Sequence, residues 1–168
     1  MDCCWKLNFE DQNQTVGGCQ GGFTEPAMDC IKHYRGVPMT VDYGNYKEIN
    51  GRCSMSGMKL VAPIKSFVHV AQNKDAVKVA LYHHGPLAVS IATPWQFEYY
   101  VNGVISADNP GPIDHTVLLV GYGTLDGVDY WTIKNSWGEG WGLRGFGLIS
   151  AANDNLSLLE EVYYPVLE

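Results

Sequence analysis

Apolar residues recur along this chain with two different spacings, and the change between them falls near residue 58. In the first part, the stretch from residue 25 to 34 has apolar side chains at steps of three and four, which predicts a helix. The remainder of that part is rich in Cys, Gly and Asn and predicts loops held by disulfides.

From residue 60 onward, short apolar runs bounded by Gly, Pro and Asn are typical of β-strands. The runs span residues 64–70, 87–92, 117–122, 130–134 and 145–150. Helical spacing returns over 75–82, before Gly85-Pro86, and an aromatic stretch over 94–101 also predicts a helix. Gly121-Tyr122-Gly123 lacks the strand-turn-helix context of a nucleotide site, so it predicts a turn between strands.

Composition excludes several classes of partner. The chain has 168 residues, of which 46% are hydrophobic, which is enough for one domain with a substantial core. A net charge of −7 and the lack of a basic run argue against nucleic acid and anionic membranes as partners, and no apolar stretch is long enough to span a bilayer. The histidines and cysteines show no metal-ligand spacing, so we expect neither a metal nor a cofactor.

Two apolar runs each contain a polar side chain suited to catalysis. His115 lies in the run from Ile113 to Val117, and Asn135 lies in the run from Tyr130 to Gly138. A histidine that removes a proton from a thiol needs a partner that fixes its ring, and an asparagine can supply it. Taken alone, a histidine on an apolar strand is more often a hydrogen-bonded core residue. The surrounding motifs therefore decide between a core and a catalytic role for His115.

The sequence around these two residues resembles the papain-like cysteine proteases. In that family the histidine lies in an Asp-His-Ala-Val type strand, here Asp114-His115-Thr116-Val117. The asparagine opens an Asn-Ser-Trp-Gly-x-x-Trp-Gly motif, here Asn135-Ser136-Trp137-Gly138-Glu139-Gly140-Trp141-Gly142. Further matches, in the family's order, are Cys19-Gln20-Gly21-Gly22, Gly121-Tyr122-Gly123 and Tyr164-Pro165-Val166. The resemblance implies an α+β, two-lobed fold, of which this chain holds mostly the antiparallel β-barrel lobe and the rear of the helical lobe.

The nucleophile of the family is missing from its expected place. It lies roughly 130–150 residues before the histidine, whereas only 114 residues precede His115. Cys4-Trp5 imitates the end of the nucleophile motif but is too close to His115 and lacks the preceding Gly-Ser or Gly-Ala. We therefore expect an N-terminally incomplete peptidase domain, with 1–58 as the remainder of the helical lobe and 59–168 as the barrel lobe and C-terminal strand. The lost helix would leave an apolar surface without a partner.

All cysteines fall in the first third of the chain: Cys3, Cys4, Cys19, Cys30 and Cys53. An odd number implies a free thiol or a partner elsewhere. The resemblance implies that Cys53 pairs with Cys3 or Cys4 and that the other of these two meets Cys30. It also implies that Cys19 pairs with a cysteine in the segment or light chain that carries the nucleophile. Disulfides need an oxidising compartment, so we expect a lysosome, a vacuole or secretion; five reduced thiols in an intracellular protein are the alternative.

The resemblance implies a role for each matching residue. His115 would hold the missing cysteine as a thiolate and later protonate the leaving amine, while Asn135 would fix its ring. Trp137 would cover their hydrogen bond, and Trp141 would wall the leaving-group side unless it only packs at the end of the barrel. The implied substrate-binding residues are Gly21, Gly22, Phe23, Thr24, Asp114, Thr116, Trp137, Trp141 and Glu161.

Two of these groups have a second interpretation. Gly21 and Gly22 would pair with the backbone of an extended peptide, although a plain turn uses the same residues. Glu161 would form the floor of the pocket for the second residue before the cleaved bond, which predicts tolerance of Arg beside Leu or Phe. Glu160 competes for that position, and both carboxylates can instead be a solvated surface pair.

The leading hypothesis is a cysteine-type endopeptidase whose Cys-His-Asn site needs a light chain or an omitted N-terminal segment, so this chain alone would be inactive. Its partners would be peptide and protein substrates, with propeptide or protein inhibitors. The alternative is a homologue that has lost catalysis and acts as a binding or structural protein. An exopeptidase would need an insertion that blocks the cleft, and these residues contain none.

Overall fold

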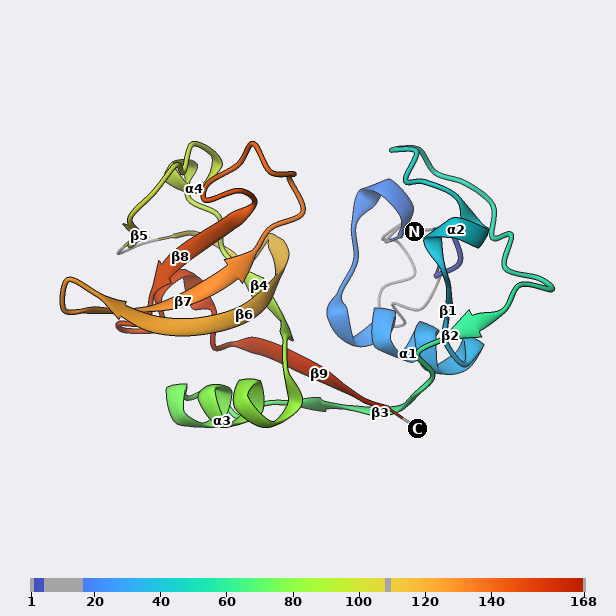
Figure 1. Cartoon of the computed structure of the whole chain (residues 1–168), viewed down its shortest axis with the longest axis horizontal. Helices are drawn as coiled ribbons and strands as arrows, with labels where there is room; N and C mark the ends of the chain where they lie inside the picture. Colours follow the sequence, from blue (N-terminus) through green and yellow to red (C-terminus); the bar gives the residue numbers. More distant parts are fainter. Residues whose placement is uncertain (1, 5–16, 108–109, 168) are drawn as a thin grey trace. The chain divides into compact units, whose positions relative to one another are not determined.

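The structure is a computed structural model that describes residues 2–4, 17–107 and 110–167 (Figure 1). It divides into two compact units: unit 1 is Met1–Val68 with Pro165–Glu168, and unit 2 is His69–Tyr164. The elements, with η for a 3₁₀ helix, are η1 (Gly18–Gln20), α1 (Thr24–Tyr34), β1 (Val37–Pro38), α2 (Thr40–Tyr43), β2 (Leu60–Val61), β3 (Ile64–His69), α3 (Lys74–His84), β4 (Leu87–Ile91), α4 (Trp95–Glu98), β5 (Val104–Ile105), β6 (His115–Leu125), β7 (Val128–Lys134), β8 (Phe146–Ser150), η2 (Asn155–Ser157) and β9 (Glu161–Leu167).

Unit 1 is held together by cross-links rather than by a large core. The predicted helix is α1, which ends where Arg35 adopts the left-handed conformation and donates its N–H to the carbonyls of the last turn. The short strands β1 and β2 pair antiparallel. Disulfides join Cys3 to Cys53 and Cys4 to Cys30, one of the two arrangements expected. Apolar side chains of this unit that remain exposed include Met39, Val41, Tyr46 and Ile49.

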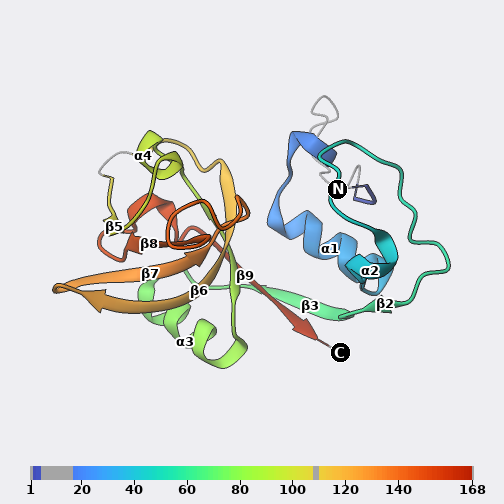
Figure 2. The ribbon, with the colours of Figure 1, turned by 45° about the horizontal axis from the view of Figure 1, so that its top comes forward.

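Unit 2 contains most of one seven-stranded sheet, in the order β3-β9-β4-β6-β7-β8-β5. The neighbouring strands from β9 to β8 pair antiparallel, as expected, but β5 pairs with β8 in parallel. In Figures 1 and 2, β6 and β7 form a long hairpin. Asp126 and Gly127 connect these strands with positive φ at both positions, which is the two-residue turn that matches strand twist.

The core of unit 2 lies where apolar residues of the sheet meet α3. On β4, Leu87, Val89 and Ile91 are completely buried, and they pack with side chains of β6, β7, β8 and β9. Helix α3 lies against the sheet at β4 and β6, as Figure 2 shows, and it buries Val77 and Leu81. The 75–82 spacing therefore predicted this helix correctly.

Two local predictions were wrong. Only Trp95–Glu98 of the predicted helix over 94–101 is helical. The indole N–H of Trp141 donates to the Phe97 carbonyl at 2.9 Å, a tertiary contact, and the Tyr100 hydroxyl makes a local hydrogen bond to the Gly103 carbonyl where the next helical turn would be. Gly121-Tyr122-Gly123 is not a turn but lies inside β6, next to an irregularity in the pairing with β7.

Candidate active site

His115 occupies a firmly anchored strand end. It is the first residue of β6 and pairs with Ile91 of β4. The preceding residue, Asp114, donates its backbone N–H to the Ile91 carbonyl at 3.1 Å. Its carboxylate accepts the backbone N–H and the hydroxyl of Thr93 at 3.0 and 2.9 Å. Asp114 thus ties β6 to the segment that follows β4, which holds the backbone of His115 in place.

Asn135 lies directly after β7 and contacts the histidine ring. Its Oδ1 lies 2.9 Å from His115 Nε2 and accepts the backbone N–H of Ser136 at 2.7 Å. The Asn135 backbone N–H donates to the Gly145 carbonyl, so the asparagine is fixed from both sides. Its side chain is buried, with 6% of the residue exposed. The two residues singled out from the sequence therefore meet across neighbouring strands.

This geometry determines which nitrogen of His115 carries the proton. Oδ1 of Asn135 already accepts from Ser136, and an amide oxygen only accepts, so His115 Nε2 must be the donor. In the neutral ring the other nitrogen, Nδ1, is then unprotonated and able to take a proton. The site can therefore act as a general base through His115 Nδ1.

Aromatic rings surround the histidine. The Trp137 ring centre lies 4.9 Å from that of His115, and the Phe97 ring centre lies 6.0 Å from it. Trp141 packs against Phe97 and Tyr100 at ring-centre distances of 4.9 and 5.2 Å. Burial raises the pKa of Tyr100, against the opposing effect of the Leu148 N–H that its hydroxyl accepts. Trp137 and Phe97 therefore pack beside the His115 ring.

A row of polar residues crosses three strands beside His115. Ser90 of β4 pairs with Thr116 of β6 on one side and with Glu161 of β9 on the other. The hydroxyls of Ser90 and Thr116 lie 3.4 Å apart. Glu160 lies before the first residue of β9 and does not pair with Ser90. The register therefore brings Thr116 and Glu161, far apart in sequence, into one row with Ser90.

The other expected substrate contacts lie in unit 1. Gly21 has a φ of 84°, which favours glycine, and open space where a side chain would project. Gly22 and Phe23 are exposed, and Phe23 directly precedes α1. Thr24, the first residue of α1, is buried. The expected substrate contacts are therefore divided between unit 1 and unit 2.

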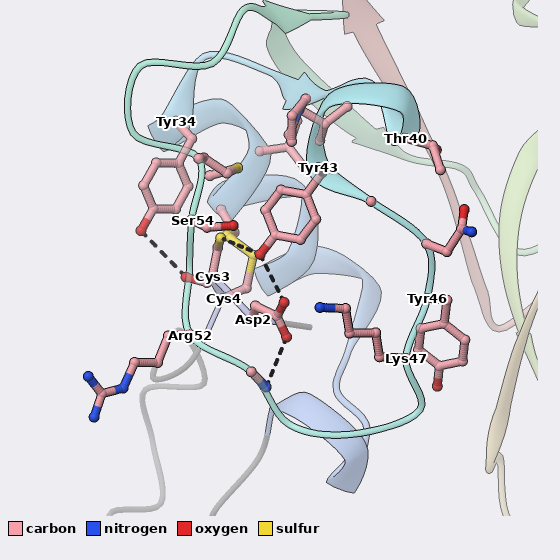
Figure 3. Close-up of a pocket in the computed structure, with 18 of the residues that line it drawn as sticks. Asp2, Cys3, Cys4, Tyr34, Thr40, Tyr43, Tyr46, Lys47, Arg52 and Ser54 are labelled. Carbon is pink, nitrogen blue, oxygen red and sulfur yellow. Dashed lines mark hydrogen bonds between the residues drawn. A yellow bond between two sulfur atoms is a disulfide. The ribbon is translucent and has the colours of Figure 1, made fainter.

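A hollow of about 590 Å³ lies in unit 1, between α1, α2 and the chain around the two disulfides (Figure 3). Figure 3 shows the Asp2 carboxylate accepting the Tyr43 hydroxyl at 2.9 Å and the Gly51 N–H at 3.1 Å. Tyr34 and Ile49 also line this space. It is large enough to take several side chains from another segment.

Cys4 carries no thiol in this structure because it is bonded to Cys30. All five cysteines lie in the described part of the chain, and Cys19 is the only one there without a disulfide; it is exposed. Two buried side-chain atoms in that part lack a hydrogen-bond partner, Thr24 Oγ1 and Asn135 Nδ2. Thr24 is one of the expected substrate contacts of unit 1, and Asn135 contacts His115 in unit 2.

Within residues 2–4, 17–107 and 110–167, no group of three or more His, Cys, Asp and Glu side chains could hold a metal ion. The same ranges contain no helix that is long and apolar enough to cross a membrane.

Comparisons with known proteins identify the family of this chain. Residues 1–166 match the family model described as "Papain family cysteine protease". The chain belongs to the papain family of cysteine proteases. It is 31% identical to pro-cathepsin H of Bos taurus over 160 residues, which are 92% of this chain and 48% of that protein. It is 35% identical to digestive cysteine proteinase 3 of Homarus americanus over 154 residues, 89% of this chain and 48% of the relative.

Solved structures of papain-family proteases share the fold. The digestive procathepsin L2 proteinase of Tenebrio molitor superposes with a TM-score of 0.86 at 28% identity, over 99% of this chain and 51% of that one. The bromelain protease of Ananas comosus, in complex with the E64 inhibitor, gives 0.83 at 28% identity, over 90% and 73% of the two chains. The two-lobed α+β prediction is thereby confirmed. The chain spans about half the length of the curated relatives it matches.

Sequence reasoning missed three residues that support this papain-family site. Phe97 lies in the aromatic stretch after β4, and nothing in that stretch distinguished it from its exposed aromatic neighbours. Thr93 and Ser90 carry no motif, and nothing in the linear sequence links Thr93 to Asp114 or Ser90 to Glu161. Pairing of distant strands is what reveals them.

Proposed function

We propose that this chain provides the general base of a cysteine-type endopeptidase, with His115 as the base and Asn135 as its positioning residue. The observation that carries the proposal is the 2.9 Å contact between His115 Nε2 and Asn135 Oδ1. The Ser136 N–H on the same oxygen fixes the asparagine and leaves His115 Nδ1 free to receive a thiol proton. A thiolate paired with an imidazolium is a strong nucleophile at neutral pH.

The reaction then has two halves. His115 takes the proton of the cysteine thiol, the sulfur attacks the peptide carbonyl carbon, and the C–N bond breaks as His115 returns the proton to the leaving amine. A water molecule next loses a proton to His115 and attacks the thioester carbon. The acid is released, and the proton on His115 goes back to the departing sulfur. Asn135 keeps the ring in one orientation through both halves, and Trp137 excludes water from their hydrogen bond.

The nucleophilic cysteine comes from a preceding segment or a separate light chain. Three observations support a missing partner: the 590 Å³ hollow in unit 1, the exposed apolar side chains of that unit, and the unpaired polar atoms of Thr24 and Asn135. Buried polar atoms are nearly always paired in a complete protein. The exposed thiol of Cys19 is the proposed point of disulfide attachment. A propeptide or protein inhibitor would occupy the same site as the substrate.

Specificity for the second residue before the cleaved bond comes from the row of Ser90, Thr116 and Glu161. The register on β4 supports Glu161, rather than Glu160, as the carboxylate of this pocket. A carboxylate in a pocket binds the guanidinium of arginine, so peptides with Arg at this position are substrates beside those with Leu or Phe. Gly21 and Gly22 hold the peptide backbone, with Phe23 and Thr24 beside them and Asp114, Trp137 and Trp141 on the side of the histidine.

An oxidising location follows from the disulfides. Two of them stabilise the described part of unit 1, and such bonds persist in lysosomes, vacuoles and outside the cell. Cathepsin and digestive proteinase relatives support the same locations.

The test uses the complete protein, purified with whatever chain accompanies this one. Intact mass is measured before and after reduction and after treatment with an epoxide thiol inhibitor. We expect reduction to release a light chain that carries one inhibitor mass, or a longer single chain to gain that mass. In peptide hydrolysis, His115→Ala should abolish turnover, and the control His33→Ala, at an exposed histidine in α1, should not.

Two results would contradict the proposal. If no thiol of the complete protein reacts with the inhibitor and peptides are not hydrolysed, the binding or structural role takes its place. If hydrolysis persists in His115→Ala, another residue is the base.

A further inference from the structure

The dipeptide Asn-Gly occurs twice in this chain, at Asn50-Gly51 and at Asn102-Gly103, and the proposed function uses neither. In this dipeptide the side-chain amide carbon of the asparagine lies within reach of the next backbone nitrogen, and glycine has no Cβ to hinder their approach. Attack of that nitrogen on the amide releases ammonia, and such reactions make asparagine one of the heat-labile residues of proteins. The structure gives the two dipeptides very different surroundings.

Asn102 and Gly103 form an exposed bend of unit 2, directly before β5. Gly103 has a φ of 82°, and nothing lies within 4 Å of the place where a side chain would project from it. In the part of the chain that the structure describes, neither the Asn102 amide nor the Gly103 N–H has a hydrogen-bond partner. The attacking nitrogen and the amide carbon can therefore meet by local rotation of the chain alone.

Asn50 and Gly51, in unit 1, provide an internal comparison. Asn50 Oδ1 accepts the backbone N–H of Cys19 at 2.6 Å, and the Gly51 N–H donates to the Asp2 carboxylate at 3.1 Å. The first hydrogen bond fixes the amide side chain. The second keeps the proton on the nitrogen that would attack, because a neighbouring negative charge opposes its loss. The same dipeptide is therefore restrained at 50–51 and unrestrained at 102–103.

Tyr100 connects the exposed bend to the core of unit 2. Its hydroxyl donates to the Gly103 carbonyl at 2.8 Å and accepts the backbone N–H of Leu148, in β8, at 3.2 Å. Its ring is buried and packs on Trp141, with the ring centres 5.2 Å apart. A change in the length of the main chain between Asn102 and Gly103 therefore displaces the acceptor of a buried tyrosine.

We propose that Asn102-Gly103 is a site of spontaneous covalent modification, at which Asn102 converts to aspartate and isoaspartate while Asn50 is protected. The Gly103 nitrogen loses its proton to hydroxide and bonds to the Asn102 amide carbon. The bond from that carbon to the side-chain nitrogen breaks, and this nitrogen leaves as ammonia after taking a proton from water. The product is a five-membered imide ring.

Water then opens the ring at one of its two carbonyl carbons, which gains the hydroxyl, while the Gly103 nitrogen regains a proton. Opening at one carbon gives aspartate. Opening at the other gives isoaspartate, in which the main chain runs through the former side chain and is one carbon longer. The whole conversion consumes one water and releases one ammonia, and it needs no enzyme, oxidant or cofactor. In isoaspartate the Gly103 carbonyl is shifted away from the Tyr100 hydroxyl.

The first experiment compares the two asparagines in one sample. The complete protein, with any reactive thiol blocked by an epoxide inhibitor to prevent self-digestion, is kept at slightly alkaline pH and body temperature for several weeks. Peptide mass spectrometry measures the gain of one dalton at each asparagine, and fragmentation distinguishes isoaspartate from aspartate. We expect Asn102 to convert about tenfold faster than Asn50, because a hydrogen bond must first break at Asn50. In urea, where the fold is lost, the two rates should become similar.

Two results overturn this assignment. If Asn50 converts as fast as Asn102 in the folded protein, or if Asn102 does not convert, the bend is not a modification site. If the difference between the two asparagines persists in urea, the contacts of Asn50 and Gly51 are not its cause. The experiment needs no peptidase activity, so it stands whether or not the proposed function is correct.

The second experiment tests the consequence for Tyr100. Thermal unfolding is compared between fresh and aged protein, and the same pair is measured for Asn102→Gln, which keeps an amide but would need a larger ring to react. We expect the aged wild type to unfold about 2–4 °C lower than the fresh protein, as the loss of one buried hydrogen bond predicts, and the aged variant to be unchanged. An unchanged midpoint after full conversion of Asn102, or an equal fall in the variant, overturns the inferred effect on Tyr100.

Discussion

At the scale of single residues, the Asn135 amide has more than one partner, and this is what gives His115 its chemistry. The Oδ1 atom accepts from both His115 and Ser136, and burial removes competing water. A hydrogen bond in such surroundings contributes about 0.5–1.5 kcal/mol, and more when its loss leaves a donor unpaired. The orientation of the imidazole is therefore the property most sensitive to substitution.

Asn135→Ala should lower kcat of the complete protein by about tenfold while KM changes little, because about 1.4 kcal/mol of ring positioning is lost only in the reacting state. Asn102→Ala, at an exposed position, is the control. Steady-state kinetics on a short fluorogenic peptide measure both constants. A kcat within twofold of the wild type would show that Asn135 does not position the ring.

Asp154 is a partly buried carboxylate whose negative charge lowers the stability of the folded protein. Burial raises the pKa of Asp154, the nearby Glu160 raises it further, and the Leu159 N–H that it accepts acts in the opposite direction. A pKa above that of the unfolded chain means that the ionised carboxylate is less favourable in the folded protein. The stabilisation that the protonated Asp154 carboxyl provides is therefore complete below the pKa of the unfolded chain. It is lost as the pH rises through the pKa of the folded protein.

Asp154→Asn should therefore stabilise the protein at pH 7, by less than about 1 kcal/mol because the group is half-exposed and screened. Asparagine keeps the acceptor for Leu159 and tolerates the left-handed backbone at this position, where φ is 49°. Urea unfolding from pH 3 to 7 should show the advantage of the variant growing as pH rises. An advantage independent of pH would point to the backbone rather than to the charge.

At the scale of elements, helix α3 combines a sequence pattern with defined ends. Asn73 accepts the Ala76 N–H at 2.9 Å and begins the helix, and Gly85 ends it with a φ of 79°. Between them, Val77 and Leu81 pack on the sheet. Because α3 covers β4 and β6, its stability supports the strand that carries His115.

Asn73→Ala should lower the free energy of unfolding by about 1 kcal/mol through loss of the cap. Asn73→Asp, which retains an acceptor for Ala76, should keep most of the stability and serves as the matched control. Urea unfolding followed by far-ultraviolet circular dichroism measures both. Equal losses in the two variants would assign the effect to something other than capping.

At the scale of the whole molecule, the two units owe their stability to different forces. Unit 2 has a continuous apolar core over its strands and α3. Unit 1 has the disulfides Cys3–Cys53 and Cys4–Cys30, with sequence separations of 50 and 26 residues. Cross-links of this length contribute about 3–4 kcal/mol each by restricting the unfolded chain. Reduction should therefore affect one unit far more than the other.

Mild reduction of this chain should make residues before 68 sensitive to limited proteolysis. The midpoint of thermal unfolding, followed by tryptophan fluorescence, should stay within about 3 °C of its original value. The fluorescence reports mainly on unit 2, which contains four of the five tryptophans. Alkylation of Cys19 without reduction is the control. A fluorescence midpoint that falls together with protease resistance would show that the units unfold as one.

Much of the fold and site was readable from residues close together in sequence. The spacing over 25–34 and 75–82 predicted α1 and α3, and the apolar runs located β3, β4, β6, β7 and β8, though some bounds shifted by one to three residues. The 94–101 prediction failed because Trp141 takes the Phe97 carbonyl, a contact 44 residues away in sequence. The short β5 was missed because two residues carry no pattern.

The sequence by itself determined the family, the pair of His115 and Asn135, and the elements in which they lie, because motifs and periodicity are local properties. Only the tertiary structure decided the tautomer of His115 and the row that joins Ser90, Thr116 and Glu161. These depend on strand register and on hydrogen bonds, which join residues 20 to 71 positions apart. Such pairings are set by the packing of the whole sheet, which no short stretch of sequence encodes.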